Sequence, residues 1–353
     1  MVNTKQREEY VEALIKEIKQ KAERCKIETI YFGGGTPTLL PILLLEKILN
    51  AIDENFDVTP DAEYTIEANP EQCSLEYLKD LRKLGFNRLS IGVQSFSDEI
   101  LHFLGRIHSS MDAFLSIENA HQAGFTNISV DLIYGIYLRK FKDWILELKT
   151  VFSLPITHLS AYALTVEENT LLHKKIAHNK IENIDEEQSL QEMNILIEET
   201  EKHNFIHYEV SNFSLKDYQS KHNSNYWNGT PYLGFGTSAH SFTGNTRSWN
   251  MANVEQYIQK INENEPCFEV EHLTPDELYN EYVLLRLRTK KGIDLKHLES
   301  CFGKAKRDFF LQSLQKINPI YYKKSSQEIT ITKKGLPLLD YITDFFIFVH
   351  YAR

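Results

Sequence analysis

The stretch ETIYFGGGTPT, residues 28–38, decides the fold. Its first part, Glu28–Phe32, is rich in β-branched and aromatic side chains and predicts a buried strand. Three glycines, a threonine and a proline follow directly, and such a loop allows a ligand to approach the backbone closely. Alone, a glycine run after a strand is more often a plain turn, and this one is neither GxGxxG nor a phosphate loop. Its neighbours in the sequence therefore decide whether it binds a ligand.

The same strand pattern recurs along the first half of the chain, with amphipathic helical stretches in between. The expected strands are Glu28–Phe32, Glu63–Glu67, Arg88–Val93, Ile128–Ile133 and His158–Leu164. The expected helices are Tyr10–Lys21, Leu43–Phe56, Leu75–Leu84, Met111–Ala123 and Asp143–Phe152. This alternation predicts an α/β fold with a parallel sheet, in which ligands bind beyond the carboxyl ends of the strands.

The pattern changes in the second half. A helix over Glu186–Lys202 and a strand over His207–Val210 lead into a polar, aromatic-rich segment, residues 211–249. The last part resembles a winged helix; its expected helices are Glu277–Arg288, Leu295–Leu298 and Lys304–Ile317, and its strands are Ile320–Lys323 and Glu328–Thr332. We expect three regions: a core over 1–170, a sheet extension over 171–265 and a small, mainly helical domain over 266–353.

Composition narrows the class of protein. The chain has 353 residues, of which 42% are hydrophobic and 25% charged, and a net charge of −10. Because no Lys/Arg stripe forms, a nucleic-acid partner is not expected, nor is DNA binding by the winged-helix-like domain. No apolar run is long enough to cross a bilayer, and the N-terminus lacks the apolar segment of a secretory signal. We expect a cytoplasmic protein, with peripheral membrane contact left open.

Polar side chains interrupt the otherwise apolar strands near their ends. Glu67, Gln94 and Asp131 lie in or directly after three successive strands. One buried polar residue is usually a satisfied core partner, because burial without a hydrogen bond costs free energy. Several on one rim of a sheet are more typical of a polar ligand site.

The motifs GGGTPT, EANPE, SIGVQSF, LGRIH and DLIYG occur in this order, and the chain resembles the radical S-adenosylmethionine (radical SAM) coproporphyrinogen oxidase family from about Glu28 to its C-terminus. The resemblance implies a partial (β/α)6 barrel whose first strand is missing here. It also implies a set of SAM-contacting residues, namely Gly34, Gly35, Thr36, Glu67, Gln94, Arg106, Asp131 and Ala163. In this set the carboxylates suit the ammonium and ribose of SAM, and Arg106 suits its carboxylate.

The family also implies a [4Fe-4S] cluster held by CxxxCxxC, with one iron open for SAM. The four cysteines, Cys25, Cys73, Cys267 and Cys301, do not have that spacing, and we expect four unrelated thiols. A misassigned start or a truncation explains this better than true loss, because the other SAM-site residues are intact. The sequence Gly135-Ile136-Tyr137-Leu138 is a second departure, since the family usually has Gly-Leu-Pro there.

Residues 222–227, HNSNYW, resemble the HNxxYW motif associated with heme binding in the HemW branch of this family. The resemblance implies a heme chaperone that passes heme to an acceptor protein, with His222 as a possible iron ligand and Asn223, Tyr226 and Trp227 shaping the site. A histidine beside aromatic residues is also a common packing arrangement, so His222 and Asn223 could instead hold a loop in place. Two alternatives stay open: an oxygen-independent coproporphyrinogen III oxidase of porphyrin biosynthesis, and a non-catalytic interaction protein.

Overall fold

The computed structural model describes residues 4–22, 25–168, 170–178 and 185–349. The chain divides into two compact units. The barrel unit consists of residues 29–42 and 63–219, and the terminal unit consists of residues 1–28, 43–62 and 220–353. The predicted division at residues 170 and 265 stays a prediction.

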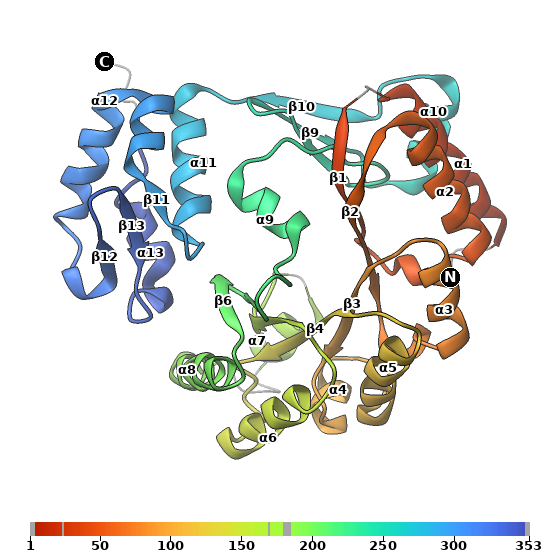
Figure 1. Ribbon diagram of the computed structural model, residues 1–353, viewed down its shortest axis with the longest axis horizontal. Coiled ribbons are helices and arrows are strands. Elements are labelled where there is room, and N and C mark those ends of the chain that lie inside the picture. Colours follow the sequence, from red (N-terminus) through yellow and green to blue (C-terminus); the bar gives the residue numbers. More distant parts are fainter. Residues whose placement is uncertain (1–3, 23–24, 169, 179–184, 350–353) are drawn as a thin grey trace. The chain divides into compact units, whose positions relative to one another are not determined.

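A seven-stranded sheet forms the frame of the barrel unit, in the order β1-β2-β3-β4-β5-β7-β6 (Figure 1). Strands β2 to β5 run parallel to one another. At the end of the sheet β7 pairs antiparallel with β5, and β6 pairs antiparallel with β7. The bounds are β1 (Lys26–Phe32), β2 (Asp57–Ala68), β3 (Arg88–Gln94), β4 (Asn127–Tyr134), β5 (His158–Ala163), β6 (Ile206–Glu209) and β7 (Asn212–Ser214). The predicted α/β half-barrel is confirmed.

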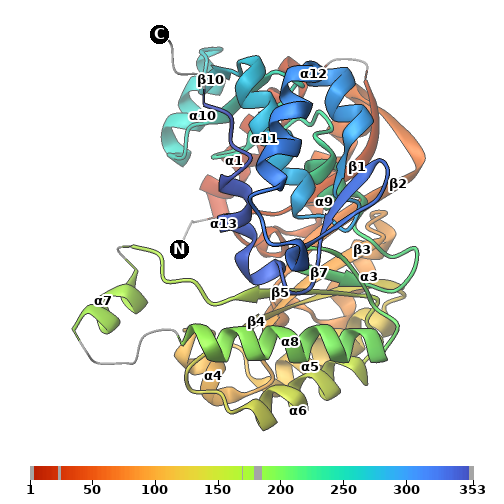
Figure 2. The same cartoon turned by 90° about the vertical axis from the view of Figure 1, so that its left-hand side faces the viewer.

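Helices cover one face of this sheet, and Figure 2 shows α5, α6 and α8 lined up beside β4 and β5. The helices of this unit are α3 (Leu75–Lys83), α4 (Asp98–Phe103), α5 (Ser110–Gln122), α6 (Phe141–Phe152), α7 (Leu171–Ala177) and α8 (Glu186–Lys202), with short 3-10 turns at Pro37–Leu39 and Pro70–Gln72. Alternate strand residues such as Leu89, Ile91, Ile128 and Val130 are fully buried in the core. Burial of these side chains is the main stabilising contribution.

The other face of the sheet is polar. Glu67 pairs with Ser90, Ser90 pairs with Ser129, and Ser129 pairs with His158 across four neighbouring strands. Side chains two residues apart on a strand share a face, so Asp131 lies on this face as well. Glu67 and Asp131, which are predicted to bind a ligand, therefore lie on the polar face of the sheet.

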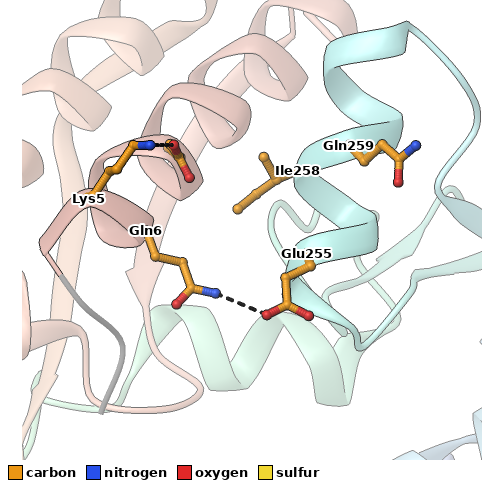
Figure 3. A pocket seen from close by; sticks show the side chains of 6 residues that line it. Lys5, Gln6, Glu255, Ile258 and Gln259 are labelled. Carbon is orange, nitrogen blue, oxygen red and sulfur yellow. Dashed lines mark hydrogen bonds and ion pairs between the residues drawn. The ribbon is translucent and has the colours of Figure 1, made fainter.

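The terminal unit is built around α1 (Thr4–Gln20), which packs against α10 (Val254–Glu263). The buried carboxylate of Glu17 fixes α1, because it accepts hydrogen bonds from Gly236 N at 2.8 Å, Asn250 Nδ2 at 2.7 Å and Tyr257 Oη at 2.6 Å. A pocket lined by Ile258 and by polar side chains lies between the two helices, where Gln6 donates to Glu255 (Figure 3). This pocket contains none of the predicted site residues.

The remaining elements of the terminal unit are α2 (Ile42–Asn55), α9 (Lys221–Asn228), β8 (His240–Phe242), β9 (Thr246–Asn250), β10 (Phe268–His272), α11 (Pro275–Leu287), β11 (Ile293–Asp294), α12 (Leu295–Leu314), β12 (Tyr322–Lys324), β13 (Glu328–Ile331) and α13 (Leu339–Asp344), with 3-10 turns at Pro319–Tyr321 and Leu336–Leu338. Strands β8 to β10 form one small antiparallel sheet and β11 to β13 another. Gly303, with φ +84°, breaks α12 where the sequence predicted two helical stretches. Among the described residues, no helix is both long and apolar enough to cross a membrane.

Candidate functional site

The glycine loop after β1 is tied to the end of β2. Glu67 accepts a hydrogen bond from Tyr31 Oη at 2.6 Å and another from the backbone N–H of Gly34 at 3.2 Å. Asn69 Nδ2 donates to Thr36 Oγ1 at 3.3 Å. Two of the predicted residues, Gly34 and Glu67, are therefore in direct contact. Thr36, in the same loop, is joined to the end of β2 through Asn69.

Two glycines of this loop are needed for different physical reasons. A side chain on Gly33 would meet Tyr31 at 2.6 Å and the Glu67 carboxyl at 3.0 Å, so the close approach excludes a Cβ. Gly34 has open space around it but adopts φ +102°, which L-residues rarely adopt. Gly35 also faces open space, so the loop leaves room beside its backbone for a ligand.

Asp131 lies in the middle of β4 and is partly buried by its neighbours. Ser90 Oγ donates to its carboxylate at 3.4 Å, and Ser160 on β5 also hydrogen-bonds to it. Desolvation raises the pKa of Asp131 to about 6, and the charge of Glu67 acts in the same direction. Buried Arg88 lowers it in part. A carboxyl that titrates near neutrality at a sheet interior is typical of a functional site.

Gln94 ends β3 in an unusual conformation. Its φ is +67°, and the pairing of β3 with β4 shifts register between Ile91 and Gln94, which re-aims the end of the strand. Gly92 leaves the space that the Gln94 amide occupies, because a Cβ there would lie 3.0 Å from Gln94 Nε2. The predicted strand end is confirmed, and its backbone conformation could not be read from the sequence.

Arg106 and Ala163 lie at two other points of the barrel unit. Arg106 follows Gly105, whose φ is +72°, and its side chain forms no hydrogen bond or ion pair with the described residues. Ala163 is the last residue of β5 and pairs with Tyr134. In the part of the chain that the structure describes, no hydrogen bond or ion pair joins either residue to Glu67 or Asp131, so their part in one site stays a prediction.

The sequence analysis missed several polar residues of this region. Tyr31, Ser90, Ser160 and Tyr162 all hydrogen-bond or couple electrostatically to Glu67 or Asp131. Burial, followed by the charge of Asp131, raises the pKa of Tyr162 to about 12. The signal that could have found them is a polar residue at every second position within strands that otherwise look apolar.

The residues present fit the groups of SAM. The loop offers exposed backbone beside Gly34 and Gly35, and two carboxylates suit an ammonium and ribose hydroxyls. Among the described residues, the guanidinium of Arg106 has no partner that would compete with a ligand carboxylate. The match concerns donor and acceptor types, since the residues of the set are not all in contact with one another.

The residues present do not fit a [4Fe-4S] cluster. All four cysteines are free thiols; Cys73 and Cys267 are buried, Cys25 is partly buried and Cys301 is exposed. Within the described ranges, no group of three or more His, Cys, Asp or Glu side chains is arranged to hold a metal ion. The expectation of four unrelated thiols stays a prediction, and we derive no chemical step through a cluster.

The HNxxYW segment forms a helix, α9, in the terminal unit. Ser220 caps its start, where its hydroxyl accepts from Asn223 N at 3.1 Å, and Gly229 ends it with φ +69°. Helical spacing places His222 and Tyr226 on one face, where His222 Nε2 lies 3.0 Å from Tyr226 Oη. This helix was not predicted, because an eight-residue polar stretch carries no apolar stripe.

An aromatic cluster continues from this face. Tyr226 meets Tyr232 edge-on with ring centroids 4.7 Å apart, and Tyr232 meets Phe242 at 6.3 Å. Tyr226 remains 41% exposed, so one side of the cluster faces solvent. Desolvation raises its pKa to about 12, so Tyr226 stays a neutral hydroxyl. Trp227 is partly buried on the same helix.

The chain matches two sequence families and several named proteins. The Radical SAM superfamily matches residues 2–146, and the HemN C-terminal domain matches residues 273–338. Heme chaperone HemW of Bacillus subtilis (strain 168) is 36% identical over 303 residues, which is 84% of this chain and 80% of that protein. Heme chaperone HemW of Lactococcus lactis subsp. lactis (strain IL1403) is 32% identical over 330 residues, 93% of this chain and 86% of that protein.

Among solved structures, coproporphyrinogen III oxidase (HemN) from Escherichia coli, a radical SAM enzyme, is similar with a TM-score of 0.82 at 26% sequence identity. The match covers 98% of this chain and 85% of that chain. The fold, the order of the motifs and the identity to named relatives agree: this chain belongs to the HemW family of the radical SAM superfamily.

Proposed function

We propose that this protein binds heme through the face of α9 that carries His222 and Tyr226, and transfers it to an acceptor protein. The observation that carries the proposal is the exposed aromatic cluster beside a histidine, in a chain that belongs to the HemW family. Aromatic side chains contact the face of a macrocycle well, and a neutral imidazole is a common iron ligand.

In this proposal heme is the cargo. His222 would exchange its contact with Tyr226 for the iron, and Tyr226 and Tyr232 would offer ring edges and faces to the porphyrin. Partial solvent exposure suits a carrier, because a cargo that must be passed on cannot be fully enclosed. The acceptor is a protein that needs heme, and we propose that the exchange takes place in the cytoplasm or at a membrane surface.

SAM is the second expected ligand, in the barrel unit. We propose that Gly34, Gly35 and Thr36 hold its methionyl part, that Glu67, Gln94 and Asp131 accept from its ammonium and hydroxyls, and that Arg106 pairs with its carboxylate. Ala163 would line the same site. The radical chemistry of the family would need a cluster held by CxxxCxxC, and the four cysteines of this chain do not have that spacing, so the proposal concerns SAM binding alone.

The relatives favour the chaperone over the alternative oxidase. The structure of the coproporphyrinogen III oxidase supports the fold, whereas the relatives from Bacillus subtilis and Lactococcus lactis, at 36% and 32% identity, are named heme chaperones.

A heme titration followed by optical absorption tests the proposal. We expect saturation at about one heme per chain, with a shifted Soret band that His222→Ala removes or weakens. His272→Ala is a matched control, because His272 is an exposed histidine of the same unit outside the aromatic cluster.

Binding that is unchanged in His222→Ala would keep the chaperone and remove His222 as the ligand. An equal loss of heme binding in His222→Ala and His272→Ala would show that heme binds nonspecifically to surface histidines. Absence of saturable binding would overturn the proposal.

A further inference from the structure

A buried cluster of charges lies behind the loops that follow β3 and β4. Arg139 is 4% exposed, and Glu147 and Glu192 are 6% and 0% exposed. Arg139 Nη2 lies 3.0 Å from Glu147 Oε2, and Nη1 lies 3.6 Å from Glu192 Oε2. The guanidinium also stacks over Trp144 at 4.6 Å. One cation is therefore shared by two carboxylates away from water.

Glu147, on α6, holds the loop that follows β3. Its carboxylate accepts hydrogen bonds from Ser95 Oγ and from the backbone N–H of Phe96, the latter at 3.3 Å. These residues come directly after Gln94, whose positive φ of +67° is unfavourable for a residue with a Cβ. The contacts of Glu147 thus stabilise an unfavourable turn at a predicted ligand-binding residue.

Glu192, on α8, holds the loop that follows β4. The backbone N–H of Gly135 donates to its carboxylate at 2.7 Å, and Arg139 Nη1 donates to the carbonyl of Ile133 at 2.8 Å. The loop is thereby folded back onto the strand that carries Asp131. This segment is also the one in which the sequence departs from the expected Gly-Leu-Pro. In this chain, contacts with buried charged side chains hold it in place.

We propose that Arg139 is a positioning residue of the candidate SAM site: by pairing with Glu147 and Glu192 it fixes the ends of β3 and β4, and with them Gln94 and Asp131. The inference rests on the SAM-binding part of the proposed function and does not involve the heme-binding helix. Arg139 itself would not touch the ligand.

The charge balance explains why the cation matters. Burial raises the pKa of Glu147, and the positive charge of Arg139 acts in the opposite direction. Without Arg139, two buried carboxylates would lose their shared counter-charge, and a buried charge without a partner is strongly unfavourable. The loops would relax to admit water or protons, and Gln94 and Asp131 would lose their fixed geometry.

The test compares Arg139→Met, Arg139→Lys and Leu148→Ala in the full chain. Leu148 is fully buried next to Glu147 on the same helix, so its truncation destabilises the unit through a cavity without removing a loop contact. SAM affinity is measured by calorimetry at a temperature where all variants are folded. We expect Arg139→Met to weaken binding about tenfold, Arg139→Lys to restore part of it, and Leu148→Ala to leave it unchanged.

A second readout does not need SAM. Hydrogen exchange of the Phe96 and Gly135 amides should accelerate in Arg139→Met and stay unchanged in Leu148→Ala. Equal effects of Arg139→Met and Leu148→Ala on affinity and exchange, or no effect of Arg139→Met on exchange, would overturn the inference. Failure of the unmodified chain to bind SAM would refute the SAM site itself, and the exchange result would still decide whether Arg139 fixes the loops.

Discussion

At the scale of single residues, Asp131 shows how the environment of a side chain prepares it for a ligand. Its pKa is raised to about 6, chiefly by desolvation among the strands. Only the ionised carboxylate accepts hydrogen bonds with both oxygens. We therefore predict that SAM affinity rises as the pH increases from 5 to 7, as measured by calorimetry in buffers of matched ionic strength.

Asp131→Asn is the control for this prediction. The amide cannot titrate, so its weaker SAM binding should not vary through pH 6. If SAM affinity depends on pH in Asp131→Asn as it does in the unmodified chain, a group other than Asp131 is responsible for the titration.

The sequence predicted part of this site and missed the rest for a definable reason. Glu67 and Asp131 are charged residues in apolar strands, so their types alone mark them. Tyr31 and Ser90 are common residues in buried strands, and alternation within one strand marks a polar face without showing that Glu67 of another strand shares it. That face exists because the opposite face of the sheet is covered by helices, which is a property of the folded chain.

At the scale of elements, two glutamates outside the candidate sites should make the free energy of unfolding depend on pH in opposite directions. Burial raises the pKa of Glu209, on β6, from 4.5 to about 7. A raised pKa adds stability below pH 4.5 that is lost as the pH rises through 7. We predict that Glu209→Gln equals the unmodified chain at pH 4.5 and exceeds its free energy of unfolding at pH 8, by at most about 3 kcal/mol.

Glu277 is the opposite case. It belongs to a capping box at the start of α11, where hydrogen bonds from Thr274 lower its pKa. Its stabilising contribution is present above pH 4.5 and is lost as the pH falls. Glu277→Gln should therefore reduce stability near neutral pH and not in acid. Urea unfolding at several pH values measures both effects, and equal pH profiles for the two variants would refute this assignment.

Element boundaries followed the sequence closely where apolar periodicity was strong. The predicted helix over Glu186–Lys202 coincides with α8, and the break in α12 falls at Gly303 as the pattern indicated. The exceptions include the first half of β2, the helix α7 and the short elements between residues 211 and 272. Strands β8 and β9 have three and five residues among glycines and asparagines, and α9 has no buried side chain, so each depends on tertiary contacts.

At the scale of the whole molecule, the two candidate sites belong to different units. The glycine loop and Asp131 lie in the barrel unit, and α9 lies in the terminal unit. The sequence showed the order of the motifs but not this partition, because the terminal unit combines three separate segments. Contacts such as that of Glu17 with Tyr257, 240 residues apart, have no signature in local patterns.

The partition allows the central claim, heme binding at α9, to be tested directly. Hydrogen–deuterium exchange of the full chain, followed by mass spectrometry with and without heme, reports which segments the ligand protects. We predict protection over residues 221–228 and the neighbouring strands β8 and β9, and none over the glycine loop at residues 33–36. Protection of the glycine loop and β4 by heme, with α9 unchanged, would contradict the account.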